Sequence, residues 1–292
     1  MPHLDSILAI TDFSAGARHA VTRSARLANE LVIGRIAALH VVERGVLDGL
    51  RRLFGGAHDL PEPFEAGARQ TLERLLKEVA EDTGCVLEPL VKSGKTLENV
   101  LEVAEDFDLL VVGARGQHKK HQLALGTTSR ALLRAHPEPV LLVRREAEAG
   151  YRNVLVAMDF SDYAKRALDW ARALAPGAAL HLIHVFDNPS PRSASYMRVN
   201  HEGLAKFRRR LLLKTEQRME NLVGDIGPLP PASSHRVVVG DPATALLEQA
   251  AEVEADLLVI GKHARPPTEQ FLLGSVTLRV LDESDCDVLV VQ

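Results

Sequence analysis

Short apolar runs alternate with longer amphipathic segments along the first half of the chain. SILAITDFS leads into a helical pattern from Ser14 to Leu31, and RIAALHVVE is followed by another from about Glu65 to Thr83. The runs VLEPLV, LLVVG and PVLLVR come next, separated by helical patterns over 96–104 and 127–134. Near-continuous apolar strands that alternate with helices are typical of a parallel sheet covered on both faces. The pattern therefore predicts an α/β fold.

The same order of elements returns in the second half. The apolar runs there are NVLVAMDFS, ALHLIHVFD, HRVVVG, ADLLVIG and DVLVVQ, and a long helical pattern covers about Gly203 to Val223. The offset between matching residues is nearly constant, at 147 positions from Asp12 to Asp159 and 148 from Gly113 to Gly261 and from Gly126 to Gly274. Such a constant offset indicates a duplication. We therefore expect two domains, at 1–145 and 151–292, joined by the polar linker REAEAGYR.

Composition and charge narrow the classes of protein. Of the 292 residues, 46% are hydrophobic and 25% charged, and the net charge of -4 gives no general attraction to nucleic acid or anionic membranes. No apolar run reaches the roughly 18 residues of a membrane helix, and the N-terminal segment does not resemble a signal peptide. Cys85 and Cys286 are isolated, which favours reduced thiols. We therefore expect a cytoplasmic protein with no nucleic-acid or membrane partner.

A glycine-rich loop follows a buried strand in the first half. Gly113 ends the strand, Gly116 follows after two residues and Gly126 after nine more, with Thr127 and Thr128 next. Glycine permits positive φ and lets a ligand approach the backbone, and the amides at the start of the next helix favour an anion. The loop is therefore predicted to hold phosphate. Its positively charged residues include Arg115, Lys119 and Lys120.

These motifs resemble the universal stress protein family. The resemblance rests on ILAITDFS and DLLVVGARG…LGTTSRALLRAHPEPVLLVR in the first half, and on VLVAMDFS and DLLVIG…LGSVTLRVLDESDCDVLVV in the second. In the ATP-binding branch of that family the loop reads G-x2-G-x9-G-[ST], which the first half matches at every position. The resemblance implies two tandem open five-stranded parallel sheets, each in the order 3-2-1-4-5 with helices on both faces. Ligands of such sheets bind at the carboxyl edge, here between strands one and four.

The resemblance also implies a nucleotide site in the first half. Asp12, with Thr11 beside it, would contact the adenine, and the strand-two backbone near Val41 would recognise the base. Ribose and phosphates would be held at Gly113, Arg115, Gly116, Gly126, Thr127 and Thr128. From the residues alone, Asp12 has a second interpretation as a helix cap, because Asp followed by Ser14 begins a helix well. One residue could serve in both roles.

The second half carries a degenerate copy of this site. Ala264 stands where the second glycine should be, and Pro266 and Pro267 lie in the loop. Proline offers no amide hydrogen and fixes φ, so this loop has fewer donors for a phosphate. We therefore expect ATP or another adenine nucleotide, with or without Mg²⁺, mainly in the first half. The residues of a second, weaker site would be Asp159, Val185, Gly261, Gly274 and Ser275.

No catalytic constellation is visible in the sequence. There is no Ser/His/Asp set, and no metal site is expected, because His118 and His121 have no carboxylate or cysteine nearby to complete one. We expect a regulatory, stress-response protein whose nucleotide state is read by an unknown protein partner, with at most weak ATP hydrolysis or autophosphorylation. Two alternatives stay open: an ATP-cleaving enzyme of a related α/β fold, and a scaffold in which both loops are structural.

Two further motifs have ordinary structural interpretations. SGKT, at 93–96, resembles the end of a Walker sequence, but Pro89 stands where that motif needs glycine, so we interpret SGKT as a helix start. FRRRLLLK, at 207–214, is interpreted as the solvated face of an amphipathic helix.

The last strand of each half is expected to pair with the other. In the family, two domains commonly associate through their last strands, and a tandem chain can make that pairing internally. PVLLVR and DVLVVQ would then cover two sheet edges that would otherwise be exposed. The resemblance thus implies an intramolecular pseudo-dimer, either as a monomer or within a homodimer.

Overall fold

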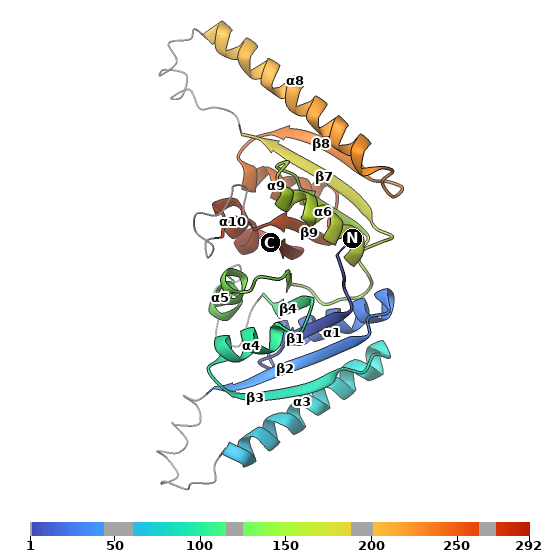
Figure 1. Ribbon diagram of the computed structural model, residues 1–292, viewed down its shortest axis with the longest axis vertical. Coiled ribbons are helices and arrows are strands. Elements are labelled where there is room, and N and C mark those ends of the chain that lie inside the picture. Colours follow the sequence, from blue (N-terminus) through green and yellow to red (C-terminus); the bar gives the residue numbers. More distant parts are fainter. Residues whose placement is uncertain (1, 44–60, 115–124, 188–200, 263–272) are drawn as a thin grey trace.

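Ten strands form one continuous sheet in the computed structural model, which describes residues 2–43, 61–114, 125–187, 201–262 and 273–292 (Figure 1). The first half contains β1 (Ser6–Ile10), α1 (Ala15–Leu31), β2 (Arg35–Glu43), α3 (Pro61–Thr83), β3 (Glu88–Gly94), α4 (Thr96–Ala104), β4 (Leu109–Gly113), α5 (Thr127–Ala135) and β5 (Val140–Val143). The second half contains β6 (Asn153–Ala157), α6 (Asp162–Leu174), β7 (Ala179–Phe186), α8 (His201–Ile226), β8 (Ser234–Val239), α9 (Pro242–Glu252), β9 (Leu257–Gly261), α10 (Ser275–Glu283) and β10 (Asp287–Val291).

The strand order confirms the predicted topology of each half. The order through the sheet is β3-β2-β1-β4-β5-β10-β9-β6-β7-β8, so each half reads 3-2-1-4-5 from its outer edge. The prediction differed in one respect, because it counted two five-stranded sheets where the structure has a single sheet of ten. The predicted pairing of the last strands explains this: β5 and β10 are antiparallel neighbours, with Leu141 opposite Leu289. Hydrogen bonds between these strands join the two halves into one sheet.

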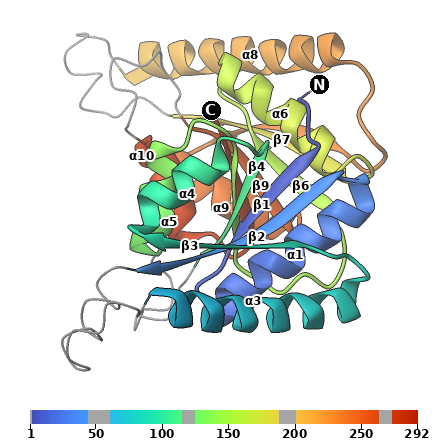
Figure 2. The same cartoon turned by 60° about the horizontal axis from the view of Figure 1, so that its bottom comes forward.

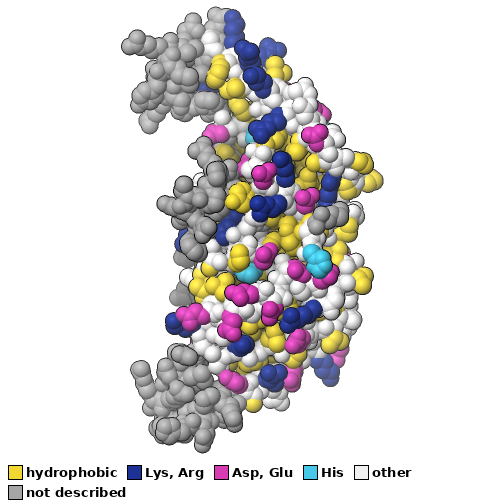
Figure 3. Space-filling view, in the orientation of Figure 1, with side chains coloured by type: hydrophobic (Ala, Val, Ile, Leu, Met, Phe, Trp, Pro, Cys, Tyr) yellow, Lys and Arg dark blue, Asp and Glu magenta, His cyan; other side chains and the backbone are white. Residues whose placement is uncertain are grey.

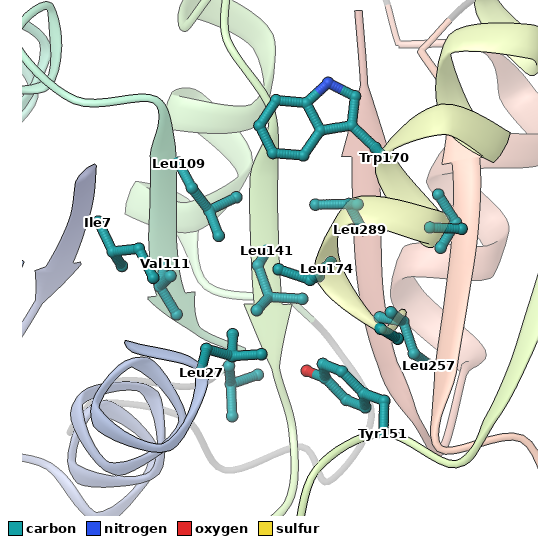
Figure 4. Packing of buried hydrophobic residues seen from close by; sticks show 14 of the residues in the cluster. Ile7, Leu27, Leu109, Val111, Leu141, Tyr151, Trp170, Leu174, Leu257 and Leu289 are labelled. Atoms are coloured by element: carbon teal, nitrogen blue, oxygen red, sulfur yellow. The ribbon is translucent and has the colours of Figure 1, made fainter. Parts of the chain in front are cut away.

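Helices cover both faces of the sheet, and each core crosses the junction between the halves. One core packs residues of α1, α3, α6 and α8 against the strands, and the other packs residues of α4, α5, α9 and α10. Figures 1 and 2 both place α3 and α8 at opposite ends of the molecule. At the junction, Leu27, Tyr151 and Leu174 lie near the facing leucines Leu141 and Leu289 (Figure 4). The two halves therefore share buried apolar surface on both sides of the sheet.

Most element boundaries follow the hydrophobic pattern. The helix predicted over 96–104 is α4, and the pattern from Ser14 to Leu31 is α1 with Ser14 as its N-cap. SGKT ends where α4 begins, as interpreted. Helix α8 is longer than predicted at both ends, and α10 was not recognised as a separate pattern in the second half.

A buried ion pair connects the first half to the second. Arg23 of α1 and Asp287 at the start of β10 are 7% and 2% exposed, and Arg23 Nε lies 3.2 Å from Asp287 Oδ2. Tyr151 of the linker donates its hydroxyl to the same oxygen at 2.8 Å, and the Arg23 guanidinium lies 4.2 Å from the centre of the Tyr151 ring. Burial raises the pKa of Asp287 above its ordinary value, while the Arg23 charge acts in the opposite direction. The pair is thus an interior charge network at the junction.

The basic segment of α8 lies at the surface. Arg209, Arg210 and Lys214 are exposed, and Leu213 on the same helix is 57% exposed. Figure 3 shows Lys and Arg side chains gathered over this end of the molecule. The first fully buried residue of α8 among those whose burial is described is Met219, nearer the end of the helix. This arrangement agrees with the interpretation of FRRRLLLK as a solvated face.

Candidate functional site

The sequence-predicted site lies at the carboxyl edge of β1 and β4. These strands are neighbours in the sheet, and the strand order reverses between them, which is where open α/β sheets bind ligands. Thr11 and Asp12 directly follow β1, and Gly113 is the last residue of β4. In the second half, β6 and β9 are neighbours in the same way, which brings Asp159 and Gly261 to the equivalent edge. Both halves therefore place a carboxylate beside the end of the glycine-bearing strand.

Asp12 braces the turn that starts α1. Its Oδ1 accepts a hydrogen bond from Ser14 N at 3.0 Å, and Ser14 Oγ in turn accepts from Ala17 N at 3.2 Å. The cap itself is therefore Ser14, and Asp12 holds the residue that caps. In the second half, Asp159 Oδ1 accepts from Ser161 N at 2.9 Å in the same arrangement. Accepting this hydrogen bond keeps each carboxylate at the sheet edge, where it can also contact a ligand.

A strained aromatic residue follows each of these aspartates. Phe13 and Phe160 have φ of 64° and 62°, in the left-handed region that bulky residues rarely adopt. Their rings lie against His40 and His184, with centroids 4.2 Å and 4.5 Å apart. Strain of this kind persists only where the surroundings fix it, and it is concentrated at functional sites. Sequence reasoning missed both phenylalanines, although the recurrence of DFS marks their positions.

His40 joins the ends of β1 and β2. Its Nδ1 lies 2.9 Å from the carbonyl oxygen of Thr11, and burial lowers its pKa below the ordinary value. Because a carbonyl can only accept, Nδ1 of the neutral ring carries the hydrogen and Nε2 remains an acceptor. Val41 follows in β2 with its side chain buried, so its backbone is the part that could meet a base. The hydrogen bond between His40 and Thr11 therefore fixes the turn after β1, at the sheet edge where Asp12 lies.

Gly113 is required by packing. A Cβ at this position would lie 2.6 Å from the carbonyl oxygen of Gly16, at the start of α1. The equivalent Cβ at Gly261 would lie 2.9 Å from Tyr163 Cβ. The close approach of a helix start to a strand end therefore explains these two glycines without any ligand.

Gly126 has a different environment. It is the N-cap of α5, has φ of -58° and makes no side-chain cap, and an added Cβ would meet no backbone atom closer than 3.7 Å. Gly274 is the equivalent uncapped start of α10. Thr127 and Thr128 follow Gly126 and are exposed. The backbone conformation does not demand a glycine at 126, where an added Cβ would lie 3.3 Å from Ser129 Oγ, whereas an open helix N-terminus favours an anion.

The loop between these glycines is clamped at its base. Gly126 N donates to the carbonyl oxygen of Ala114 at 3.1 Å, and Ser129 Oγ donates to that of Gly113 at 3.0 Å. In the second half, Gly274 N and Thr277 Oγ1 donate to the carbonyl oxygens of Lys262 and Gly261 at 3.3 Å and 3.2 Å. The two ends of each loop are therefore held together at the sheet edge. The predicted residues Arg115, Gly116, Lys119 and Lys120, the histidines His118 and His121, and Ala264, Pro266 and Pro267 lie outside the described residues.

In the second half, the predicted residues line one cavity. Its volume is about 260 Å³, and Asp159, Val185, Gly261, Gly274 and Ser275 all contribute to its wall. The remaining wall is largely apolar, formed by residues that include Ile183, Leu246, Ile260 and Val276. An apolar cleft with a few convergent polar groups is the usual form of a small-molecule site.

In the first half, the start of α5 borders a groove of about 410 Å³. Thr127 and Thr128 line it together with Lys95 and Thr96 at the start of α4. The helix start in SGKT therefore lies beside the predicted phosphate residues, an arrangement that sequence reasoning did not foresee. Lys95 Nζ lies 2.5 Å from Glu98 Oε1, so its charge is already shared at the surface. At the equivalent place in the second half, Asp241 caps α9 and pairs with Arg279 at 2.6 Å.

A model described as the universal stress protein family matches the chain twice, over residues 3–144 and 150–292. The chain belongs to the universal stress protein family.

Individual relatives agree with this assignment. A universal stress protein of Mycolicibacterium smegmatis is 28% identical over 242 residues, which cover 78% of each chain. Universal stress protein A homolog 2 of Coxiella burnetii is 33% identical over 149 residues, covering 49% of this chain and 95% of that protein. A universal stress protein structure from Archaeoglobus fulgidus superposes over 99% of this chain with a TM-score of 0.68 at 22% identity. The last comparison extends the shared fold over both halves.

Two negative observations apply to the described part of this universal stress protein. None of its helices is both long and apolar enough to cross a membrane. Nor do those residues include a group of three His, Cys, Asp or Glu side chains arranged to hold a metal ion.

Proposed function

We propose that this universal stress protein binds ATP, or another adenine nucleotide, mainly in its first half. The observation that carries the proposal is the start of α5, an uncapped helix N-terminus with two exposed hydroxyls at the same sheet edge as Asp12. Amides of Gly126, Thr127 and Thr128 would hold phosphates with the helix dipole, while Asp12 and the β2 backbone at Val41 would hold the adenine. Any Mg²⁺ would enter with the phosphates.

The preference for the first half rests on charge as well as on the loop sequence. The first-half loop contains Arg115, Lys119 and Lys120 beside Gly116, whereas Lys95 in the adjoining groove already pairs with Glu98 and shares that groove with Glu43. In the second half, Lys262 directly follows Gly261 of the cavity wall. Its side chain is 2% exposed and donates to the carbonyl oxygen of Arg134 across the junction. Its ammonium group is therefore directed away from a phosphate at α10. We propose that the second cavity is the weaker site and favours the base over the phosphates.

The proposed role is regulatory. Nucleotide would stabilise one arrangement of the two loops through its differential affinity, and a protein partner would read that arrangement. Each half would act as one domain, at 1–145 and 151–292, in an internal pseudo-dimer located in the cytoplasm.

The test is a calorimetric titration of the full chain with ATP and Mg²⁺. We compare the wild type with Asp12→Ala and Asp159→Ala, because each variant loses the hydrogen bond that its carboxylate accepts from the backbone amide two residues later, one in each half. The wild type should show one dominant binding event. Asp12→Ala should raise its Kd by about tenfold or more, equivalent to ~1.4 kcal/mol, whereas Asp159→Ala should leave it unchanged.

Three other outcomes of the titration would contradict the proposal. Absence of both binding heat and a rise in melting temperature would favour the scaffold. Steady release of ADP or AMP that Asp12→Ala abolishes would favour an ATP-cleaving enzyme. Loss of the dominant event in Asp159→Ala alone would assign the main site to the second half.

A further inference from the structure

Helix α5 is held near both ends by side chains of the second half. Lys262, directly after β9, donates its ammonium to the carbonyl oxygen of Arg134 at 2.9 Å, in the last turn of α5. Asp282 of α10 accepts from Arg130 Nη2 at 2.6 Å, and Leu125 N lies 3.4 Å from the same oxygen. Leu125 directly precedes Gly126, so the Asp282 contacts reach the start of the helix.

The burial of Lys262 is unusual for a lysine. It is 2% exposed, and burial lowers its pKa to about 8. Removing an ammonium group from water is costly, and a hydrogen bond to one carbonyl offsets only part of that cost. A gain in stability therefore does not explain why Lys262 is buried. Its hydrogen bond across the junction, by contrast, fixes the position of α5.

The two halves do not exchange these contacts symmetrically. At the offset of 148 positions, Lys262 corresponds to Ala114 and Asp282 corresponds to Arg134, while Arg130 corresponds to Leu278. Alanine and leucine side chains cannot form the equivalent hydrogen bonds. The first half does contact the last turn of α10, where Arg144 donates to the carbonyl oxygen of Leu281. The contacts of Asp282, in contrast, reach the start of α5.

We propose that Lys262 and Asp282 are positioning residues, through which the second half sets the orientation of α5 and thereby the nucleotide affinity of the first half. This inference rests on the proposed function of α5. A nine-residue helix is a rigid unit, and binding groups must be held within about 0.5 Å of their productive geometry. Loss of either anchor should therefore lower the affinity of the first-half site.

The same contacts link the two proposed sites. Gly261 and Gly274 line the second cavity, and the carbonyl oxygen of Lys262, the residue after Gly261, accepts from Gly274 N at 3.3 Å. A ligand that shifts the base of the second loop would therefore shift the anchor of α5. Because coupling between binding sites is reciprocal, nucleotide in the first half would change the affinity of the second half by the same factor.

The inference is tested by titrating the full-length variants with ATP and Mg²⁺. Lys262→Met keeps the apolar stem and removes the donor, and Asp282→Ala removes the acceptor. Glu283→Ala is the matched control, because Glu283 is the next residue of α10 and pairs with Arg279 of the same helix at 3.1 Å. Each anchor variant should raise the Kd for ATP by about fivefold or more, with the control within about twofold of the wild type. Lys262→Arg keeps a cationic donor and should therefore raise the Kd less than Lys262→Met does.

Hydrogen exchange without nucleotide separates this inference from the proposed function. Amides of α5 should exchange faster in both anchor variants than in the wild type and the Glu283→Ala control, while those of α1 should not change. If the wild type fails to bind ATP, the proposed function fails, and the exchange rates still decide whether α5 is anchored. Wild-type ATP affinity in both anchor variants would overturn the inference, as would unchanged exchange of α5.

Discussion

Replacing Leu141 with aspartate should lower the free energy of unfolding by about 4 kcal/mol or more. Leu141 and Leu289 are 0% exposed and lie opposite each other in β5 and β10, so the carboxylate would have no route to water. The change also puts a smaller, charged side chain in place of a leucine that both halves contact. Urea denaturation followed by circular dichroism measures the effect.

The control is the same substitution at an exposed leucine. Leu213→Asp lies on the outer part of α8, where the side chain is 57% exposed, and should change the free energy of unfolding by less than about 0.5 kcal/mol. A loss below about 1 kcal/mol in Leu141→Asp would mean that the two halves do not associate through these strands.

Replacing Arg23 with methionine should cost about 3–5 kcal/mol of unfolding free energy, because it leaves Asp287 buried without its cation. The loss should depend on pH in a defined direction. Burial raises the pKa of Asp287 in the folded state, so in the variant the penalty is present above that pKa and falls as acid protonates the carboxylate. Denaturation curves of wild type and variant at several pH values measure the difference.

Two controls limit the interpretation of that experiment. Arg18 lies on the same helix as Arg23 and pairs at the surface with Glu78 of α3, so Arg18→Met should cost less than about 1 kcal/mol. The double variant Arg23→Met with Asp287→Asn should recover part of the loss, since no charge is then left buried. Equal losses in Arg18→Met and Arg23→Met would contradict the role given to the buried pair.

Much of the fold could be predicted because the hydrophobic pattern is local. Strands such as β2 and β4 are buried on both faces and therefore appear as continuous apolar runs, whose ends match the structure. The constant offset between matching residues of the two halves indicates the duplication, and the family resemblance implies the strand order. The single ten-stranded sheet follows from the pairing of β5 with β10, which joins two edges that the prediction counted separately.

The site was less predictable, because side-chain direction depends on packing that no local pattern contains. Lys262 occupies a loop position that reads as solvent-facing, yet the structure buries it against α5. Gly113 reads as a ligand glycine, but the start of α1 already excludes a Cβ there. The strained φ of Phe13 and the groove that brings Lys95 beside Thr127 arise from contacts between separate elements. Whether the predicted site residues bind nucleotide stays a prediction.

Mass spectrometry of the small molecules released from freshly purified protein tests the central claim most directly. The wild type is compared with Gly126→Val and with its second-half counterpart Gly274→Val. Both glycines have backbone angles that valine can adopt, and an added Cβ at Gly126 meets only the Ser129 hydroxyl closer than 3.4 Å. An adenine nucleotide should be released from the wild type and from Gly274→Val and should be missing from Gly126→Val. Absence of adenine nucleotide from the wild type, even after incubation with ATP and desalting, would contradict the account, as would its full retention in Gly126→Val.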